Sequence, residues 1–76
     1  MGGVPIPAHC FLHRCQYLKV TDGKKVWRNA SGDQFYTWDT LHGEVEVFNK
    51  RGKHLGVMNP EGEFVKPAIR GRQLNV

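Results

Sequence analysis

The sequence predicts a mainly β fold, an antiparallel meander of four to five strands behind an N-terminal arm with at most one short helix. Turn signals rich in Gly, Asn, Asp and Pro recur about every 8–12 residues from residue 21 onward, as in antiparallel meanders. The segments between them are rich in β-branched and aromatic residues. Residues 44–48 alternate Glu or Phe with Val, as a strand with one buried face does.

The N-terminal segment, residues 1–20, is expected to form the arm and any short helix, and residues 21–76 to form the sheet of a single domain. Residues 1–8 contain two glycines and two prolines, which favour an extended arm. Residues 9–20 fit a short helix or a strand, because their apolar positions follow a helical stripe only loosely. The opening Met-Gly-Gly leads us to expect a terminal domain of a longer protein.

Four strands, and a short fifth, are expected from residue 21 onward. Asp22-Gly23 is a strong turn signal before the first strand, and turns that contain glycine separate the others. The tail, residues 67–76, has little periodicity. The expected strands span residues 25–28, 34–39, 44–49, 54–58 and 63–66.

Composition argues against a disordered chain and against a membrane span. Hydrophobic residues make up 39% of the 76 residues and eight residues are aromatic, which suffices for one modest core. No apolar run approaches the ~20 residues of a transmembrane helix. The N-terminus also lacks the charged start and long apolar stretch of a signal peptide.

The chain is basic, with 11 Lys and Arg against 7 Asp and Glu and a formal net charge of +4. Its basic residues form three clusters that could each contact several phosphates, and the aromatic residues between them favour single-stranded or looped nucleic acid. A merely solvated surface is the alternative. The clusters are Lys24/Lys25/Arg28, Lys50/Arg51/Lys53 and Lys66/Arg70/Arg72.

The segment 36–46, YTWDTLHGEVE, holds the residues best suited to proton transfer. One histidine and three carboxylates fall within residues 39–46. Strand alternation assigns the two valines here to the core and predicts that His42 and Glu46 share a solvent-facing surface near Asp39. RNA cleavage needs a base for the 2′-hydroxyl, an acid for the leaving 5′-oxygen and a cation for the phosphorane charge.

In such a reaction Glu46 suits the base, His42 the acid, and an Arg or Lys the electrostatic clamp; the swapped assignment of acid and base is also allowed. Asp39 could orient and charge His42, as carboxylates often do. Residues four apart on a straight strand are separated by about 13 Å, too far to flank one phosphate. We therefore expect the strand to bend, or to begin, at Gly43. The alternative without catalysis is a solvated acidic face paired to Lys or Arg across the sheet.

The same segment resembles the motif Y-x-W-D-x-x-H-G-E-h-E (h apolar) of the cytotoxic domain of cloacin and the ribosome-cleaving E-group colicins. Trp27 keeps that family's eight-residue gap to Tyr36, and the resemblance extends over about residues 24–74. Residues 1–20 have no counterpart, which leads us to expect a different delivery system. The downstream similarity to the family's H-L-G…(D/N)-P…G segment lies in His54-Leu55-Gly56, Asn59-Pro60 and Gly62.

The resemblance implies a toxin domain with a highly twisted antiparallel sheet that cuts 16S ribosomal RNA in the decoding site and stops translation. It implies a ribonuclease that needs no metal or other cofactor and does not bind membranes through this domain. A cognate immunity protein is the expected partner besides 16S rRNA, and the domain is expected to be a monomer. We expect it to be exported as the C-terminal part of a larger toxin and to act in the cytoplasm of the target bacterium.

Carried over residue by residue, the catalytic set is Asp39, His42 and Glu46. The family's C-terminal arginine falls on Arg72, with Arg70 as the alternative, because the tail is too divergent to fix its register. The expected substrate-binding residues are Tyr36, Trp38, Glu44, Lys50, Arg51, Lys53 and Arg70.

The sequence also leaves other roles open for its cysteines and remaining histidines. His9, Cys10, His13 and Cys15 could suggest zinc, but they are crowded into seven residues and no second ligand pair is evident. A disulfide between the two cysteines suits an exported toxin, with free buried thiols as the default. His54 is expected to be a packed or surface histidine. Two other function classes are a non-catalytic RNA-binding module and a small protein-interaction domain.

Overall fold

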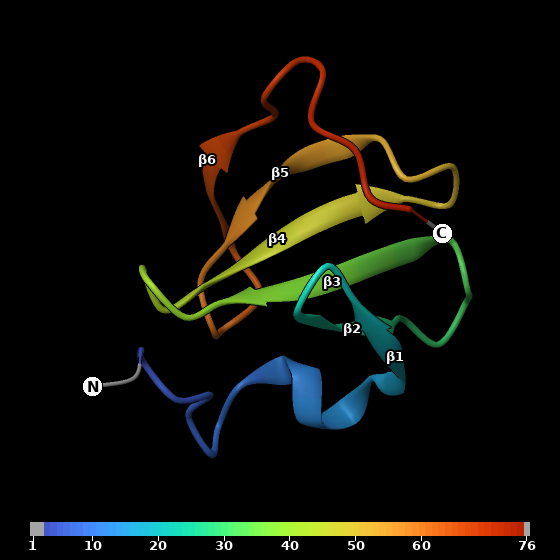
Figure 1. The fold of residues 1–76 in the computed structure, drawn as a ribbon. Helices are drawn as coiled ribbons and strands as arrows, with labels where there is room; N and C mark the ends of the chain where they lie inside the picture. Colours follow the sequence, from blue (N-terminus) through green and yellow to red (C-terminus); the bar gives the residue numbers. More distant parts are fainter. Residues whose placement is uncertain (1–2, 76) are drawn as a thin grey trace.

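Six antiparallel strands form one sheet in the computed structural model, which describes residues 3–75 (Figure 1). The predicted mainly β class is confirmed, with six strands instead of four to five. Within the described residues, no helix has the length and apolar character to span a membrane. The elements are a 3₁₀ helix η1 (Phe11–Arg14) and the strands β1 (Gln16–Thr21), β2 (Lys24–Arg28), β3 (Gln34–Asp39), β4 (Glu44–Asn49), β5 (His54–Met58) and β6 (Phe64–Pro67).

Each strand pairs with its neighbour in sequence, so the sheet is a meander of hairpins, as predicted. Asp22 and Gly23 form the first hairpin turn, and their φ angles of 51° and 76° fit the type I′ turn that Asp-Gly favours. The expected strands match β2 to β6 to within one residue at each end. The segment 9–20, expected to be a helix or a strand, contains η1 and then most of β1. Parts of the expected arm and tail, residues 1–2 and 76, lie outside the described residues.

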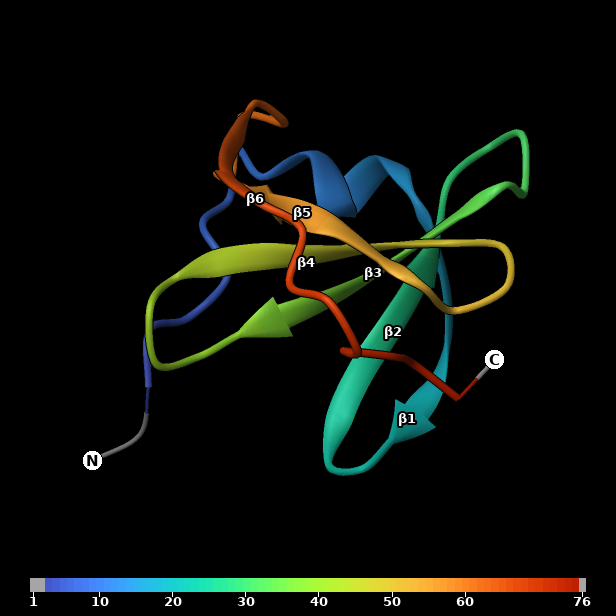
Figure 2. The ribbon, with the colours of Figure 1, turned by 90° about the horizontal axis from the view of Figure 1, so that it is seen from above.

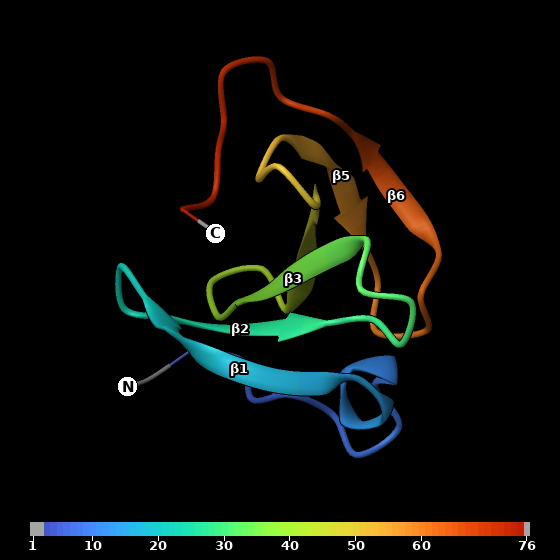
Figure 3. The same ribbon diagram turned by 90° about the vertical axis from the view of Figure 1, so that its right-hand side faces the viewer.

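The sheet is strongly curled, and the C-terminal tail crosses its concave side (Figures 2 and 3). Shifts of register between β1 and β2, β4 and β5, and β5 and β6 add to the twist. Along the tail, the N–H of Leu74 donates to the carbonyl of Gly52 at 2.8 Å. At its end, Nζ of Lys19 on β1 donates to the carbonyl of Asn75 at 3.3 Å. The tail therefore connects the β6 side of the sheet to the β1 side.

One face of the sheet, which we call the arm face, packs against the N-terminal segment to form the main core. Val45 and Val47 of β4 lie there, each 0% exposed, which confirms their assignment to the core. Ile6 and Phe11 of the N-terminal segment pack against this core. The core consists of Cys10, Leu12, Trp27, Tyr36, Trp38, Val45 and Val47.

The opposite face, which we call the cleft face, is also buried at its centre. The prediction that Glu46 faces solvent is wrong, because its side chain is only 8% exposed. Alternation along β4 separates the two faces correctly, but the curl of the sheet and the crossing tail cover the second face as well. The buried residues of the cleft face are Val26, Thr37, Glu46, Phe48, His54 and Val57.

Candidate active site

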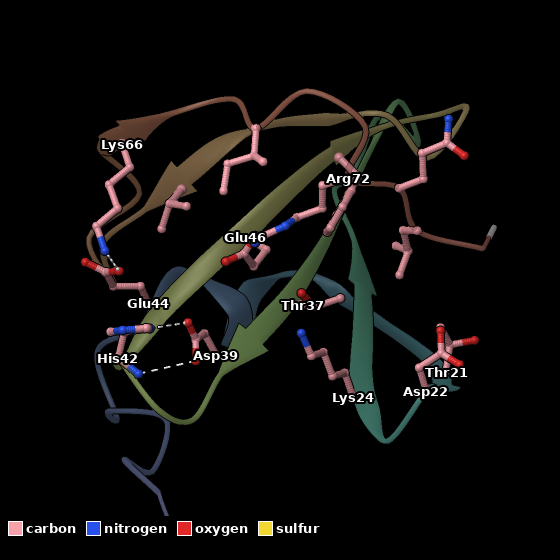
Figure 4. A pocket seen from close by; sticks show the side chains of 15 residues that line it. Thr21, Asp22, Lys24, Thr37, Asp39, His42, Glu44, Glu46, Lys66 and Arg72 are labelled. Atoms are coloured by element: carbon pink, nitrogen blue, oxygen red, sulfur yellow. Dashed lines mark hydrogen bonds and ion pairs between the residues drawn. The ribbon is translucent and has the colours of Figure 1, made fainter.

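A cleft of about 440 Å³ opens on the cleft face, lined by residues of strands β1 to β6 and of the tail (Figure 4). All four residues expected to be catalytic line it, although they come from three separate parts of the chain. The polar and charged lining consists of Thr21, Asp22, Lys24, Thr37, Asp39, His42, Glu44, Glu46, Lys66, Arg72 and Gln73. The apolar lining consists of Phe48, Val57, Ile69 and Leu74.

His42 lies beside Asp39, on the loop between β3 and β4. Nδ1 of His42 lies 2.8 Å from Oδ2 of Asp39, while Oδ1 accepts the backbone N–H groups of Leu41 and His42. The aspartate thus caps the turn with one oxygen and orients the ring with the other. The expectation that His42 continues the alternation of β4 is wrong, because residues 40–43 form a turn. The ring is 56% exposed and remains accessible to a substrate.

Gly43 allows this turn to close. Its φ of 67° lies in the left-handed region, and its N–H donates to the carbonyl of Asp39 at 2.8 Å. β4 begins at the next residue, Glu44, directly opposite Asp39, which confirms the expected start at Gly43. Residues two apart on one strand face are separated by about 7 Å. The Asp39–His42 pair therefore lies about 7 Å from Glu46 along the strand direction. On a straight strand, His42 would lie two such repeats from Glu46.

The carboxyl group of Asp39 is partly buried, which by itself raises its pKa. The hydrogen bonds from the His42 ring and from the backbone amides of His42 and Leu41 favour the carboxylate. They outweigh the burial, so the pKa of Asp39 is lowered overall. The ionised aspartate can then stabilise a positive charge on His42 at neutral pH.

Glu46 carries a buried carboxylate at the floor of the cleft. Nη1 of Arg72 donates to Oε1 of Glu46 at 2.7 Å, and Nε2 of His54 lies 2.8 Å from the same oxygen. The Arg72 side chain is 44% exposed, so its guanidinium is the more accessible partner. Pairing of this kind is required where a charge is buried, because an unpaired buried carboxylate would be strongly unfavourable.

Further cations surround the cleft. Nζ of Lys66 donates to Oε1 of Glu44 at 2.9 Å, and this hydrogen bond raises the pKa of the Lys66 ammonium (Figure 4). Lys24 reaches the cleft from β2. With Arg72, these lysines give the cleft three cationic groups beside its acid–base residues. The arrangement suits a phosphate-containing ligand.

Of the residues expected to bind substrate, Glu44 lines the cleft, and the structure separates the others from it. Tyr36 and Trp38 are 5% and 6% exposed in the core of the arm face, so their expected contact with substrate in the cleft is not supported. Alternation on β3 explains this, because both lie one position from cleft-facing residues. Lys50, Arg51 and Lys53 lie in and beside the turn before β5 and do not line the cleft. Arg70 is exposed outside the cleft, whereas Arg72 lies inside it.

Several cleft-face residues were not assigned to the site from the sequence, among them His54, Lys66 and Thr37. His54 contacts Glu46, and its place in the His54-Leu55-Gly56 similarity is the signal that could have identified it. Lys66 belonged to a recognised basic cluster, but only the pairing of β5 with β6 brings it to the cleft. Thr37 is 1% exposed opposite Glu46, and its Oγ1 has no hydrogen-bond partner among residues 3–75. No sequence signal marks it.

The N-terminal segment holds the loop that carries His42. The N–H of Val4 donates to the carbonyl of Thr40 at 2.6 Å, and Nε1 of Trp38 donates to the carbonyl of Val4 at 2.8 Å. A Cβ on Gly43 would lie 3.0 Å from Cγ1 of Val4. Residues 3–6 thus pack directly against one end of the site.

The structure does not gather the four residues considered for zinc. Nε2 of His9 pairs with Glu61, and Nε2 of His13 lies 2.9 Å from the carbonyl of Pro7. Cys10 and Cys15 are free thiols, and burial raises the pKa of each. No group of three or more potential metal ligands occurs in the described part of the chain.

Fold and cleft together define a small, curled all-β domain with a histidine–carboxylate pair and a carboxylate–arginine pair in one cleft. The family model described as Cytotoxic matches residues 15–75, so the chain belongs to the cytotoxic-domain family and is a toxin domain. A comparison with curated proteins found no match. The match begins just before β1, and the segment 3–14 that covers the arm face precedes it.

Proposed function

We propose that this toxin domain is an endoribonuclease that cleaves 16S rRNA in the ribosomal decoding site and so stops translation. The observation that carries the proposal is the meeting of Asp39–His42 and Glu46–Arg72 in one cleft that also holds two lysines. Attack of a 2′-hydroxyl on the neighbouring phosphodiester needs a base, an acid and a cation. A carboxylate, an exposed imidazole and a guanidinium can supply these three roles.

In the proposed reaction Glu46 accepts the proton of the 2′-hydroxyl. The oxygen so freed attacks the adjacent phosphorus, the bond from phosphorus to the 5′-oxygen breaks, and His42 donates its proton to that 5′-oxygen. The products are a 2′,3′-cyclic phosphate and a 5′-hydroxyl. Asp39 stabilises the protonated His42 before the step.

Arg72 has the role of the electrostatic clamp. Its half-exposed guanidinium turns from Glu46 to the scissile phosphate when RNA enters, which leaves the carboxylate free to act as base. Lys24 and Lys66 add positive charge at the rim. The protein supplies base, acid and clamp, so the proposed reaction uses no metal ion or other cofactor.

The setting of the reaction is part of the same proposal. The domain is delivered into the cytoplasm of a target bacterium as the C-terminal part of a larger exported toxin. A cognate immunity protein protects the producing cell. Membership of the cytotoxic-domain family supports a role of this kind.

A non-catalytic RNA-binding module is the second candidate, because the buried pairing of Glu46 with Arg72 and His54 would also stabilise a passive fold. Incubation of the purified domain with intact bacterial ribosomes in EDTA, followed by mapping of 16S rRNA ends, separates the two. The ribonuclease gives a single new end in the decoding region. Bound but intact 16S rRNA would favour the binding module, and a small protein-interaction domain would show little salt-dependent RNA binding.

A further inference from the structure

His54 is a buried imidazole beside the cleft, and the reaction proposed above gives it no role. Its side chain is 0% exposed, and its ring meets that of Phe48 edge to face with centroids 5.2 Å apart. A β-bulge brings it there, because the register shifts after Val47 and His54 pairs with Phe48 where Leu55 would otherwise stand. A polar ring buried in this way needs partners for its nitrogens.

Nδ1 of His54 accepts the backbone N–H of Ile69 at 2.9 Å. A nitrogen that accepts a backbone N–H carries no proton itself, so the ring is neutral and its single proton is on Nε2. Nε2 lies 2.8 Å from Oε1 of Glu46. Among residues 3–75 no hydrogen bond of good geometry is formed by this N–H, so the 2.8 Å separation marks a close approach of the two groups.

Two groups thus converge on one oxygen of Glu46. Nη1 of Arg72 donates to Oε1 at 2.7 Å, and Nε2 of His54 faces the same atom. Oε2 is then the oxygen that remains for a substrate hydroxyl. The backbone N–H of His54 also donates to the carbonyl of Arg72 at 3.2 Å, so this residue touches both the base and the segment that carries the clamp.

We propose that His54 is a positioning residue for Glu46, an inference that rests on the proposed ribonuclease function. The Nε2–H group holds Oε1 when Arg72 turns to the phosphate, so that Oε2 stays directed at the 2′-hydroxyl. The amide of Ile69 holds the ring in the tautomer that can donate. The residue itself touches neither the RNA nor the reacting atoms.

Two substitutions of His54 test the roles of the two ring nitrogens separately. His54→Gln keeps an N–H donor near the place of Nε2, and His54→Asn keeps an acceptor near the place of Nδ1. We expect His54→Gln to retain kcat to within about threefold, whereas His54→Asn lowers kcat by about tenfold or more, because it leaves Glu46 without its donor. KM should change little in either variant, and the acidic limb of the pH–rate profile should move only in His54→Asn.

The measurements are single-turnover cleavage of 16S rRNA by folded protein, with thermal unfolding to confirm the fold of each variant, and ¹⁵N NMR of the wild-type histidines. A protonated Nε2 on His54 with a bare Nδ1 is the expected tautomer, and it tests the role even if neither variant folds, because a protonated Nδ1 would leave Nε2 without the proton that it must donate. If folded wild-type protein cleaves no RNA, both the proposed ribonuclease function and the proposed role of His54 are wrong. An active wild type with a protonated Nδ1, or with equal losses in both variants, overturns the role of His54 alone.

Discussion

Arg72 and Glu46 form a 2.7 Å contact, although 26 positions separate them in the sequence. The contact joins the C-terminal tail to β4 across the concave side of the sheet. It also selects Arg72 over Arg70 as the arginine of the site, because only Arg72 lines the cleft.

Substitution of Arg72 by Ala is expected to lower the rate of 16S rRNA cleavage by about 100-fold, because the transition-state charge loses its donor. Arg70→Ala, in the same tail but outside the cleft, is the matched control and should leave the rate nearly unchanged. Single-turnover cleavage of ribosomes at fixed salt measures both. A larger loss in Arg70→Ala would show that the assignment of the clamp is wrong.

Glu46→Gln should lower the rate of cleavage by about 100-fold or more, because the amide cannot accept the 2′-hydroxyl proton. RNA affinity should change little, because the neutral amide has nearly the size of the carboxylate and introduces no charge that would repel phosphates. The control is Glu44→Gln, two residues away on the same strand face and paired with Lys66. Filter binding and cleavage assays in parallel give the result, and equal losses in both variants would contradict the role of Glu46.

The lowered pKa of Asp39 predicts a pH-dependent part of the stability. Because the pKa is lower in the folded state, this contribution is present above the unfolded-state pKa of about 3.9 and is lost as pH falls through the folded-state value. Asp39→Asn should therefore have a lower Tm than the wild type at pH 6, and the difference should shrink below pH ~4. Thermal unfolding between these values tests this; a difference that is constant with pH would contradict it.

The N-terminal segment should stabilise the His42 loop through Trp38. Trp38→Phe removes the Nε1 donor to the carbonyl of Val4 and is expected to lower the unfolding free energy by about 1 kcal/mol. It should also speed hydrogen exchange at the amide of Val4, which donates to Thr40. Trp27→Phe, at another buried indole of the same core, should leave that exchange unchanged. Unchanged exchange in Trp38→Phe would argue against this coupling.

Thr37→Val should stabilise the protein by about 1 kcal/mol, because it replaces a buried hydroxyl that has no hydrogen-bond partner within residues 3–75 by a methyl group of similar size. Thr37→Ser keeps the hydroxyl and loses a buried methyl group, so it should destabilise. Urea unfolding of both variants gives the comparison. A destabilised Thr37→Val would mean that the hydroxyl has a partner in solution.

The strands could be predicted because their signals are local. Alternation around Val45 and Val47 and the Asp22-Gly23 turn depend on neighbours in sequence, and the structure agrees with both. The break at Gly43 followed from a distance argument about His42 and Glu46 and also holds. The expected orientation of His42 by Asp39 is also present, although His42 makes this contact from a turn outside the strand.

Burial on the cleft face could not be predicted from alternation alone. Glu46 is covered because a distant tail returns across it, and His54 turns to the same face because of a bulge that no residue pattern announces. The aromatic residues Tyr36 and Trp38 suggested RNA contacts, but the N-terminal segment packs over them. Each difference arises from contacts between segments far apart in sequence.

The chemistry of the new RNA ends tests the central claim most directly. Ribosomes incubated with the wild-type domain in EDTA should yield a single cut in 16S rRNA, with a 2′,3′-cyclic phosphate upstream and a 5′-hydroxyl downstream. Glu46→Gln should yield neither end. A 5′-phosphate beside a 3′-hydroxyl, or intact 16S rRNA in the presence of folded wild-type domain, would contradict the proposed attack by the 2′-hydroxyl.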